Sequence, residues 1–377
     1  MAYTTIKKPS DYFNTVTYTG DGTSSRNITG VGFQPDLLWI KNRDITQWHF
    51  LFDAVRGVSK ALFSNVTNAE STQASTQTAF LSDGFTVGND VASNGNGNGI
   101  VSWNWLGANG TASNTDGSIT STVSANTTSG FSIVSYTGTG ANATVGHGLG
   151  SDASMVLIKN RDATNNWFVH HKDIGGVACL NLDTTDIPFS PGTAAFQNPP
   201  LTSSLIQLAT NVSVNNSGQN YIAYCFSEVK GFSKFGSYVG NGNADGTFVY
   251  TGFKPAFVMF KDTTSAGDWT IQDSARDTFN LADARLYANL NNSENDGSLG
   301  VDFLSNGIKI RTSSVGWNRS NTKYIYMAFA SNPFVTSTGI PTCARWFVQT
   351  QNVRESFYPK GQIQTIVLYT ASKEINS

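Results

Sequence analysis

The four histidines are the first candidates for catalysis or metal binding, because imidazole transfers protons near neutral pH and is the commonest metal ligand. His170 and His171 are adjacent, and adjacent side chains of a strand point to opposite faces, so the two cannot easily share one ion. His147 lies between two glycines in an expected turn, and His49 follows Trp48 in an expected strand. The partner ligands that a zinc site needs are missing from this pattern. We therefore expect packing or surface roles for the histidines, and neither a metal nor a cofactor.

Carboxylates paired with arginines recur at matching places near the start and the end of the chain. An enzyme needs one well-built site, whereas repetition of a polar pattern is typical of a scaffold, such as an ion pair that holds a loop in place. The alternative is a binding site copied together with the fold, which would provide multivalent attachment. Glycosidase carboxylates on distant loops would not be visible in the sequence, but no catalytic pattern stands out and we expect no enzymatic activity. The recurring pairs are Asp53 with Arg56 and Asp273 with Arg276, accompanied by Glu70 and Glu294.

Three tryptophans, each followed within a few residues by an aspartate, form another recurring pattern. An exposed indole stacks on sugar rings while its N–H makes a polar contact, so these residues would suit carbohydrate recognition. The alternative is that a tryptophan at a repeated position of a small β-domain belongs to its core. The candidate contacts with a glycan or receptor are Trp48, Asp53, Arg56, Trp167, Asp173, Trp269, Asp273 and Arg276.

Cysteines and acidic turns add no further chemistry. Cys179, Cys225 and Cys343 are too few and too scattered for a disulfide framework or a metal site, and Cys225 is expected to be a small residue in a strand. The turn at Asp21-Gly22 and the stretch 241–246 are rich in Asp, Asn and Gly. They lack the ordered ligand series and terminal Glu of a calcium-binding loop, so turn formation explains them.

One stretch of sequence, used three times, must position these residues. Its copies at 32–44, 148–162 and 252–262 each contain turn formers, then four consecutive apolar residues, then a lysine. A short apolar run between such boundaries is typical of a strand that is buried on both faces. The pattern therefore favours a sheet over a helix.

Further features recur around each copy in the same order, and they indicate internal repetition. Each unit opens with Tyr-x-Gly and closes with an aromatic strand, of which 100–105, 221–226 and 324–329 are the three copies. Short strands at this spacing favour sandwiches over a propeller, whose blades would be about 40 to 50 residues long. We predict an all-β protein with three tandem jelly-roll-like β-sandwich domains. The expected segments are a lead at 1–15, sandwiches at 16–107, 131–229 and 230–331, a Ser/Thr/Asn/Gly linker at 108–130, and an extension at 332–377.

Composition excludes several classes of protein. Charged residues make up 13% of the chain and the formal net charge is −2, so the basic surface of a nucleic-acid-binding protein is missing. The N-terminal residues have no apolar core of signal-peptide length, and no run of about 18 apolar residues occurs. We expect no nucleic-acid partner, no membrane insertion and no secretion by a standard signal.

The extension is expected to form a β-hairpin around 359–361. Two strands alone are marginally stable in water, so the hairpin would dock on the third domain, a neighbouring subunit or another protein. The expected assembly residues are Trp346, Phe347, Ile366, Leu368 and Tyr369.

A set of motifs along the chain has a recognisable combination, at 9–13, 32–43, 53–57, 82–88, 145–150, 222–226, 231–238 and 324–341. Together they resemble virion proteins of marine tailed phages, both cyanophage-like and pelagiphage-like, that consist of tandem β-domains. The similarity covers residues 1 to 345, whereas residues 346–377 depart from the pattern of those proteins.

The resemblance implies a non-enzymatic phage structural protein, favoured as a tail fibre or appendage whose loops adsorb to a host-surface glycan or protein. It also implies other virion proteins as partners, a homo-oligomer for which a trimer is favoured by analogy, and a place in the virion after assembly in the host cytoplasm. A capsid-decoration or head-fibre protein is the alternative. A polysaccharide-degrading tailspike enzyme is the third hypothesis and has the least support.

Overall fold

The computed structural model describes residues 4–297 and 299–333. The expected tail hairpin, its assembly residues from Trp346 to Tyr369, and Cys343 lie outside the described residues. Within the described part, no helix is long and apolar enough to cross a membrane.

Strands dominate, and they form three successive β-sandwiches that we call repeat 1 (13–105), repeat 2 (112–227) and repeat 3 (233–333). Two 3₁₀ turns, η1 (Pro9–Asp11) and η2 (Lys172–Ile174), and three short helices complete the described elements: α1 (Val91–Asn94), α2 (Val212–Asn215) and α3 (Val315–Asn318). Repeat 1 contains β1 (Phe13–Thr19), β2 (Arg26–Thr29), β3 (Leu37–Asn42), β4 (Phe50–Asp53), β5 (Lys60–Phe63), β6 (Ser71–Thr72), β7 (Gln77–Leu81), β8 (Gly84–Val87) and β9 (Gly99–Trp105).

Repeats 2 and 3 follow the order of β1–β5 and β7–β9, and repeat 2 begins with two further strands, β10 and β11. Repeat 2 contains β10 (Ala112–Asn114), β11 (Ser121–Asn126), β12 (Phe131–Thr137), β13 (Ala143–Gly146), β14 (Ala153–Asn160), β15 (Phe168–His171), β16 (Leu180–Asn181), β17 (Phe196–Leu201), β18 (Leu205–Leu208) and β19 (Asn220–Ser227). Repeat 3 contains β20 (Ser233–Val239), β21 (Phe248–Tyr250), β22 (Phe253–Asp262), β23 (Thr270–Asp273), β24 (Leu286–Tyr287), β25 (Val301–Leu304), β26 (Gly307–Ile310) and β27 (Lys323–Pro333).

Each repeat pairs a large inner sheet with a three-stranded outer sheet. The inner sheets have the orders β1-β9-β3-β4-β5-β6, β10-β11-β12-β19-β14-β15-β16 and β20-β27-β22-β23-β24, and the outer sheets β2-β8-β7, β13-β18-β17 and β21-β26-β25. In the three inner sheets, the last long strand lies next to the strand of the repeated stretch: β9 between β1 and β3, β19 between β12 and β14, and β27 between β20 and β22. The all-β, sandwich prediction is confirmed.

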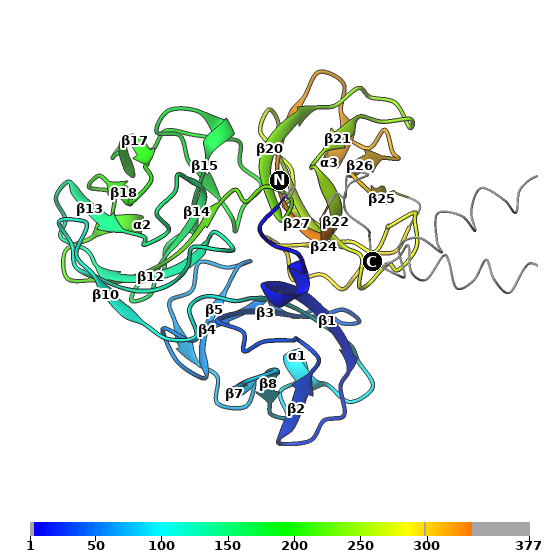
Figure 1. Ribbon diagram of the computed structural model, residues 1–377, viewed down its shortest axis with the longest axis horizontal. Helices are drawn as coiled ribbons and strands as arrows, with labels where there is room; N and C mark the ends of the chain where they lie inside the picture. The colour runs from blue at the N-terminus through cyan, green and yellow to red at the C-terminus, as the bar shows by residue number, and fades with distance from the viewer. Residues whose placement is uncertain (1–3, 298, 334–377) are drawn as a thin grey trace, which may run out of the picture. The chain divides into compact units, whose positions relative to one another are not determined.

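The strands of the repeated stretch are buried on both faces, as their apolar runs predict. Every residue of β3 and β14 is buried, as is 257–262 of β22. One face of each inner sheet packs against its own outer sheet, and the opposite face packs into a core shared by all three repeats. Figure 1 shows the three sandwiches around this common core.

The segment 108–130, expected to be a linker, is instead largely part of repeat 2. Its strands β10 and β11 extend the inner sheet through β12. Val123 is buried in the sandwich core while its neighbours in β11 are polar. A strand at the border of a sheet needs only a few buried side chains, so a Ser/Thr-rich composition was a poor guide here.

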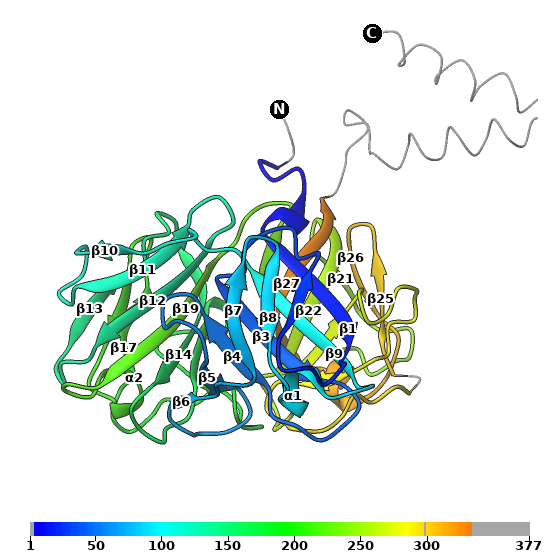
Figure 2. The same ribbon diagram turned by 90° about the horizontal axis from the view of Figure 1, so that it is seen from below.

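The N-terminal lead packs against repeat 3 as well as repeat 1. Ile6 is buried in the shared core, and the rings of Tyr12 and Phe232 lie 6.0 Å apart. β1 then begins at Phe13, whose ring lies 4.9 Å from that of Phe329 at the other end of the described chain. Figure 2 shows the start of β1 and the end of β27 at one end of the assembly of repeats, with α1 and α2 at the opposite end.

The opening Tyr-x-Gly motif fixes a hairpin to the short helix in every repeat. The hydroxyls of Tyr18, Tyr136 and Tyr238 each donate to a helix carbonyl at 2.7 Å. The glycine two residues later passes so close to the helix end that a Cβ at Gly138 would lie 2.4 Å from the carbonyl oxygen of Asn216. Only glycine fits there, which explains why the motif recurs.

A buried asparagine at the end of each helix completes this arrangement. Asn215 accepts a hydrogen bond from the backbone N–H of Thr139 at 2.8 Å and donates to the carbonyls of Ala141 and Ala209 at 2.6 and 2.8 Å. Asn94 and Asn318 accept from the hairpin backbone in the same way. The asparagines therefore position the hairpin loops that follow each Tyr-x-Gly motif.

Replacing Asn215 with alanine is expected to lower the free energy of unfolding by about 2 to 3 kcal/mol, because a buried backbone N–H and two carbonyls lose their partner. Urea denaturation followed by tryptophan fluorescence measures the change. Asn216→Ala is the matched control, since only the backbone of Asn216 is hydrogen-bonded here. Equal stability of the two variants would contradict the role given to Asn215.

Candidate functional site

The arginines and carboxylates predicted as binding residues form buried networks where the repeats meet. At the contact between repeats 1 and 2, Arg56 pairs with Asp53 at 2.5 Å, and both side chains are fully buried. Arg56 also bonds Glu70 at 3.2 Å and the Tyr224 hydroxyl of repeat 2 at 3.2 Å. Tyr224 in turn donates to Asp53 at 2.8 Å, and Arg161 of repeat 2 bonds Glu70 at 2.8 Å.

The contact between repeats 3 and 1 repeats this network with its own residues. Arg276 pairs with Asp273 at 2.6 Å and with Glu294 at 2.7 Å. The indole N–H of Trp103 donates to Asp273 at 3.0 Å, in the place of the Tyr224 hydroxyl. Arg43 of repeat 1 binds Glu294 with both its Nε and an Nη nitrogen.

Within the described residues, the contact between repeats 2 and 3 has no buried arginine–carboxylate network; there, the partly exposed Glu228 pairs with Lys172 of repeat 2 at 2.8 Å and with Lys234 of repeat 3 at 2.6 Å. The strand register places His171 opposite Met155, as Asp53 lies opposite Leu37 and Asp273 opposite Phe257. By the same register, Ile174, Pro188, Thr263 and Met327 occupy the positions of Arg56, Glu70, Arg161 and Tyr224. All five positions of the network are therefore exchanged together for residues without a carboxylate or an arginine.

Backbone hydrogen bonds join the repeats in a closed cycle. Asn165 donates to Thr67, Gly267 to Thr185 and Gln47 to Asn291, at 2.9 to 3.0 Å. The three donors are equivalent residues of the three repeats, and so are the three acceptors. Repeat 1 therefore contacts repeat 2, repeat 2 contacts repeat 3, and repeat 3 contacts repeat 1 through the same elements.

Two of the three predicted tryptophans are buried at these contacts and form hydrogen bonds across them. Trp167 is fully buried and donates its indole N–H to the carbonyl of Phe63 at 2.8 Å. Trp269 donates to the carbonyl of Asn181 at 2.9 Å. Since both rings are enclosed by protein, they pack as core residues and present no face to a sugar in this structure.

The sequence pattern treated Trp48 as the counterpart of these tryptophans, and the structure shows that this is wrong. Its side chain is 37% exposed and packs edge-on against Phe63 at 4.8 Å. His49, one residue later, takes the equivalent position, with Nδ1 accepting from the Trp39 indole at 2.9 Å. Repeat 1 has a histidine where the other two repeats have a tryptophan, so matching the tryptophans by residue type placed repeat 1 one residue out of register.

Asp173 is likewise not equivalent to Asp53 and Asp273. It lies in the 3₁₀ turn η2 with its side chain half-buried, and its carbonyl accepts a hydrogen bond from Lys323. His171 takes the equivalent place instead. The predicted set of eight residues is therefore divided between buried contacts of the repeats and two separate surface positions.

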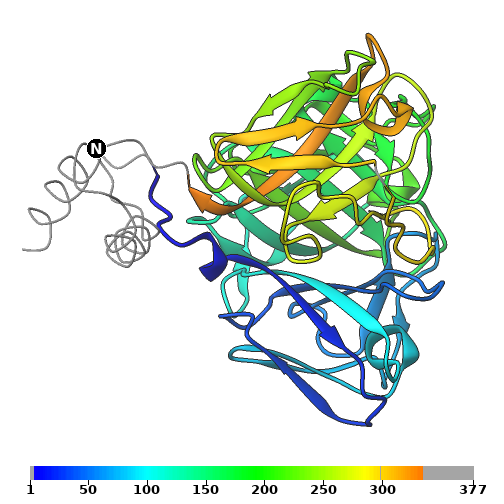
Figure 3. The same cartoon turned by 90° about the vertical axis from the view of Figure 1, so that its right-hand side faces the viewer.

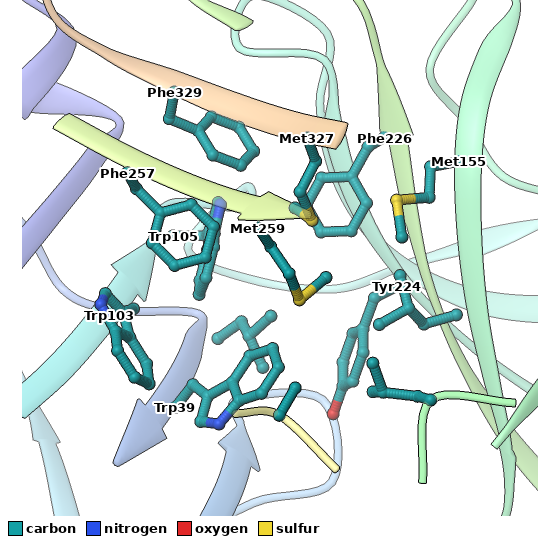
Figure 4. Packing of buried hydrophobic residues seen from close by; sticks show 14 of the residues in the cluster. Trp39, Trp103, Trp105, Met155, Tyr224, Phe226, Phe257, Met259, Met327 and Phe329 are labelled. Atoms are coloured by element: carbon teal, nitrogen blue, oxygen red, sulfur yellow. The ribbon is translucent and has the colours of Figure 1, made fainter. Parts of the chain in front are cut away.

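The shared core lies between these three contacts and is rich in large side chains. Trp105, Phe226 and Phe329 come from equivalent positions of β9, β19 and β27 and pack together, with ring centroids 5.7 to 6.4 Å apart. Figure 4 shows them with Phe257 and Met259 of β22, Met155 of β14 and Met327 of β27. These side chains are buried and belong to one hydrophobic core.

Three buried lysines were not predicted as structural residues. Lys41, Lys159 and Lys261 end the apolar runs, and each ammonium bonds backbone carbonyls, two of them across a contact at Thr67 and Thr185. Burial lowers the pKa of each lysine to about 8. A lysine after four apolar residues, repeated three times, was the sequence signal that could have identified them.

The four histidines are all buried, and hydrogen bonds hold at least two of them in the neutral form. In His171, Nδ1 accepts from the backbone N–H of Asp173 at 3.1 Å and Nε2 faces the Tyr326 carbonyl at 3.3 Å. His147 has the same arrangement with Leu149 and Thr202. His49 accepts at Nδ1 from Trp39, and its Nε2 faces the backbone of Tyr287 without a regular hydrogen bond.

The comparison with protein families gives one match, to a domain of unknown function (DUF7483) over residues 8–333. The chain belongs to the DUF7483 family. The matched region includes all three repeats, so the DUF7483 domain corresponds to the whole cycle of sandwiches and not to one of them. No curated protein matches the chain.

Among the described residues of this DUF7483 chain, no group of three or more His, Cys, Asp or Glu side chains could hold a metal ion. Cys179 and Cys225 are buried free thiols, and burial raises the pKa of each to about 12. Cys225 therefore has the packing role expected for it.

Replacing Arg56 with isoleucine is expected to lower the free energy of unfolding by about 3 to 5 kcal/mol, because the buried carboxylate of Asp53 loses its counter-ion. Adding Asp53→His should recover part of that loss, since the pair then matches His171 and Ile174 at the contact between repeats 2 and 3. Urea denaturation measures both variants. Arg161→Thr, which removes a partly exposed pair, should cost only about 1 kcal/mol or less. A double variant no more stable than Arg56→Ile would refute this explanation.

Acid is expected to destabilise the protein through His171, whose pKa burial lowers to about 4. The unfolded chain then binds more protons than the folded chain between pH 6.5 and 4, so stability falls as the pH falls through this range. Between pH 6.5 and 5 the loss at His171 is about 1.5 kcal/mol. His171→Asn should reduce the pH dependence of the unfolding free energy by this amount. Identical pH profiles for the two proteins would disprove the assignment.

The wild-type protein must be compared with His171→Asn because other groups titrate in the same pH range. Burial raises the pKa of Asp36 to about 6, so its contribution to stability decreases as the pH rises from 4 to 6. Asp36 is present in both proteins, and its effect cancels in the difference.

Proposed function

We propose that this chain is a structural protein of a tailed-phage virion, a tail fibre or related appendage that displays loops for adsorption to the host surface. The similarity of its motifs to marine phage virion proteins supports this proposal. The single structural observation that carries it is the closed cycle of three matching sandwiches, whose repeated ionic and aromatic residues are used inside the cycle to hold it together.

The hairpin loops are the parts that the scaffold leaves free for recognition. Residues 21–25, 139–142 and 241–245 are exposed, and they follow the Tyr-x-Gly motif in each repeat. The buried glycines and asparagines at their base are the same in all three repeats, whereas the loop sequences differ. A constant base with variable loops is the arrangement that binding proteins use.

The two ends of the assembly of repeats differ, and this difference suggests which end attaches to the virion and which faces the host. The described chain enters at η1 and leaves at the end of β27 on one side, and α1 and α2 lie on the opposite side (Figure 2). Val91, Val212 and Val315, the first residue of each helix, are 43%, 52% and 56% exposed. We assign attachment to the end where the chain enters and leaves, and host contact to the end with the helices and hairpins.

A further candidate surface lies beside the contact between repeats 3 and 1. A cavity of about 470 Å³ there is lined by Thr46, Tyr287, Asn292, Asn295 and Asp296, with Ser293 and Glu294. Hydroxyl, amide and carboxylate groups of this kind bind polar ligands such as sugars. Glu294 is already paired with Arg43 and Arg276, and the side chain of Asn295 accepts a hydrogen bond from Arg285 at 2.9 Å, so these two side chains are already engaged within the protein.

Purified full-length protein is expected to lower phage adsorption when it is mixed with host cells beforehand, because it occupies the receptor. Counting unadsorbed phage by plaque assay measures the effect, and heat-unfolded protein is the control. Gold-labelled antibodies against the protein should mark the tail or its fibres in electron micrographs. Label on the head together with unchanged adsorption would reject the appendage role and favour a capsid-decoration protein.

A further inference from the structure

The outer sheet of repeat 3 carries two exposed aromatic side chains on its border strand. Phe248 is 43% exposed and Tyr250 is 54% exposed, both on β21. Residues two apart in a strand point to the same face, and Val249 between them is buried in the sandwich core. Figure 3 shows the strands β25 and β26 of this sheet, in orange, facing the viewer. The two rings therefore lie on the solvent side of the sheet, away from the shared core.

The fold does not require aromatic residues at these positions. In the register of the outer sheets, Phe248 corresponds to Asn27 in repeat 1 and Thr144 in repeat 2. Tyr250 corresponds to Thr29 and Gly146. The same strands form with polar or small residues in the other repeats, so packing does not explain the rings in repeat 3.

The surroundings of the rings form a flat platform. Gly307 lies opposite Tyr250 on β26, and a Cβ at Gly307 would come within 2.8 Å of the Phe248 ring. Leu304 lies opposite Gly307 on β25 and is partly exposed. The missing side chain at Gly307 lets the Phe248 ring lie close to the strand surface, and we call Phe248, Tyr250, Leu304 and Gly307 the platform.

Charges around the platform compensate one another. Lys309 pairs with Asp245 at 2.7 Å, and Arg311 pairs with Asp302 at 3.2 Å. The two cations and two anions leave no net charge for attracting an ionic polymer. Among the described residues, the hydroxyl of Tyr250 has no hydrogen-bond partner, so it can bond a hydroxyl group of a ligand.

A second copy of the chain would find too little apolar surface here. An aromatic side chain contributes about 150 to 250 Å², so two half-exposed rings offer roughly 200 Å², compared with about 800 Å² per partner in a stable dimer. A pyranose ring needs much less. Its C–H face packs on an aromatic face, and its hydroxyls accept or donate hydrogen bonds at the edge.

We propose that the platform is a binding site for a sugar ring of an uncharged polysaccharide. This inference rests on the proposed adsorption function and names the class of ligand and the residues that hold it. Phe248 and Tyr250 stack on the sugar, and the Tyr250 hydroxyl with the adjoining Lys309 and Asp245 bonds its hydroxyl groups. Asp245 belongs to the exposed hairpin 241–245, so the site adjoins the loops assigned to host contact.

The test uses the full-length chain and an array of purified bacterial surface polysaccharides, both uncharged and anionic. Wild-type protein is expected to bind at least one uncharged polysaccharide, and isothermal titration then gives its affinity. Phe248→Asn with Tyr250→Thr, which installs the repeat 1 residues, should weaken binding at least tenfold. Because those residues already form this strand in repeat 1, the variant is expected to fold, and circular dichroism checks it.

Trp48→Asn is the matched control, since it replaces another exposed aromatic residue with the one found at the equivalent position of repeat 2, Asn166. It should leave the affinity unchanged. The inference is overturned if wild-type protein binds no uncharged polysaccharide, if the platform variant binds as tightly as wild type, or if only Trp48→Asn loses binding. Self-association that the platform variant abolishes, measured by analytical ultracentrifugation, would also overturn it.

Failure of this site and failure of the proposed function give different results. A platform variant that still blocks phage adsorption as wild type does refutes the platform and leaves the adsorption function standing. Wild-type protein that binds a polysaccharide but neither blocks adsorption nor marks the virion tail refutes the function and leaves the sugar site standing.

Discussion

Burial of the inner sheets on both faces is the constraint on which the rest of the structure depends. An apolar strand such as β3 can be fully buried only if a second layer covers the side that its own outer sheet does not. Each repeat obtains that layer from the other two, through Trp105, Phe226 and Phe329 and the residues around them. A single sandwich would expose this whole face to water, at a cost of about 25 cal/mol for each Å² of apolar surface. The three repeats are therefore stable as a group.

The cycle is closed by two contacts with a buried arginine–carboxylate network and one without such a network, and this asymmetry follows from the energetics of buried charge. A buried arginine and carboxylate are tolerated only as a complete set, because removal of one partner leaves an unpaired charge. Asp53, Arg56 and Glu70 are therefore retained together at one contact, and their counterparts are absent together at the contact formed by His171 and Ile174. A combination that keeps Asp53 without Arg56 would be costly, which accounts for the joint exchange of these two positions. The histidine there keeps its backbone hydrogen bonds and stays neutral, so no unpaired charge takes the place of Asp53.

Much of the fold could be predicted from the sequence, since the repeated apolar runs and Tyr-x-Gly motifs depend on local geometry. The Tyr-x-Gly motif is needed because Gly138 touches a helix backbone, and the four apolar residues before each lysine are needed because both faces of the strand are covered. The relation between repeats could not be predicted, since it depends on pairs such as Arg43 and Glu294 that are 251 residues apart. For the same reason, recurring carboxylates and tryptophans could be recognised as repeated but could not be placed inside or outside. The register error at Trp48 arose because the true counterpart, His49, differs in residue type from Trp167 and Trp269.

The residues that differ among repeats are therefore more informative about recognition than those that recur. A side chain present in all three repeats, such as the buried lysine or asparagine, is needed to build each sandwich and is enclosed by it. A side chain that occurs once and is exposed, such as Tyr250, has no such structural requirement in the two other copies of the fold. Keeping an aromatic residue in water instead of Thr or Gly brings no benefit to folding, and an exposed apolar group favours unwanted association. Internal repetition thus provides a comparison within one chain. Two repeats show which residues the fold requires, and an exposed residue that differs in the third repeat is one that the fold does not require.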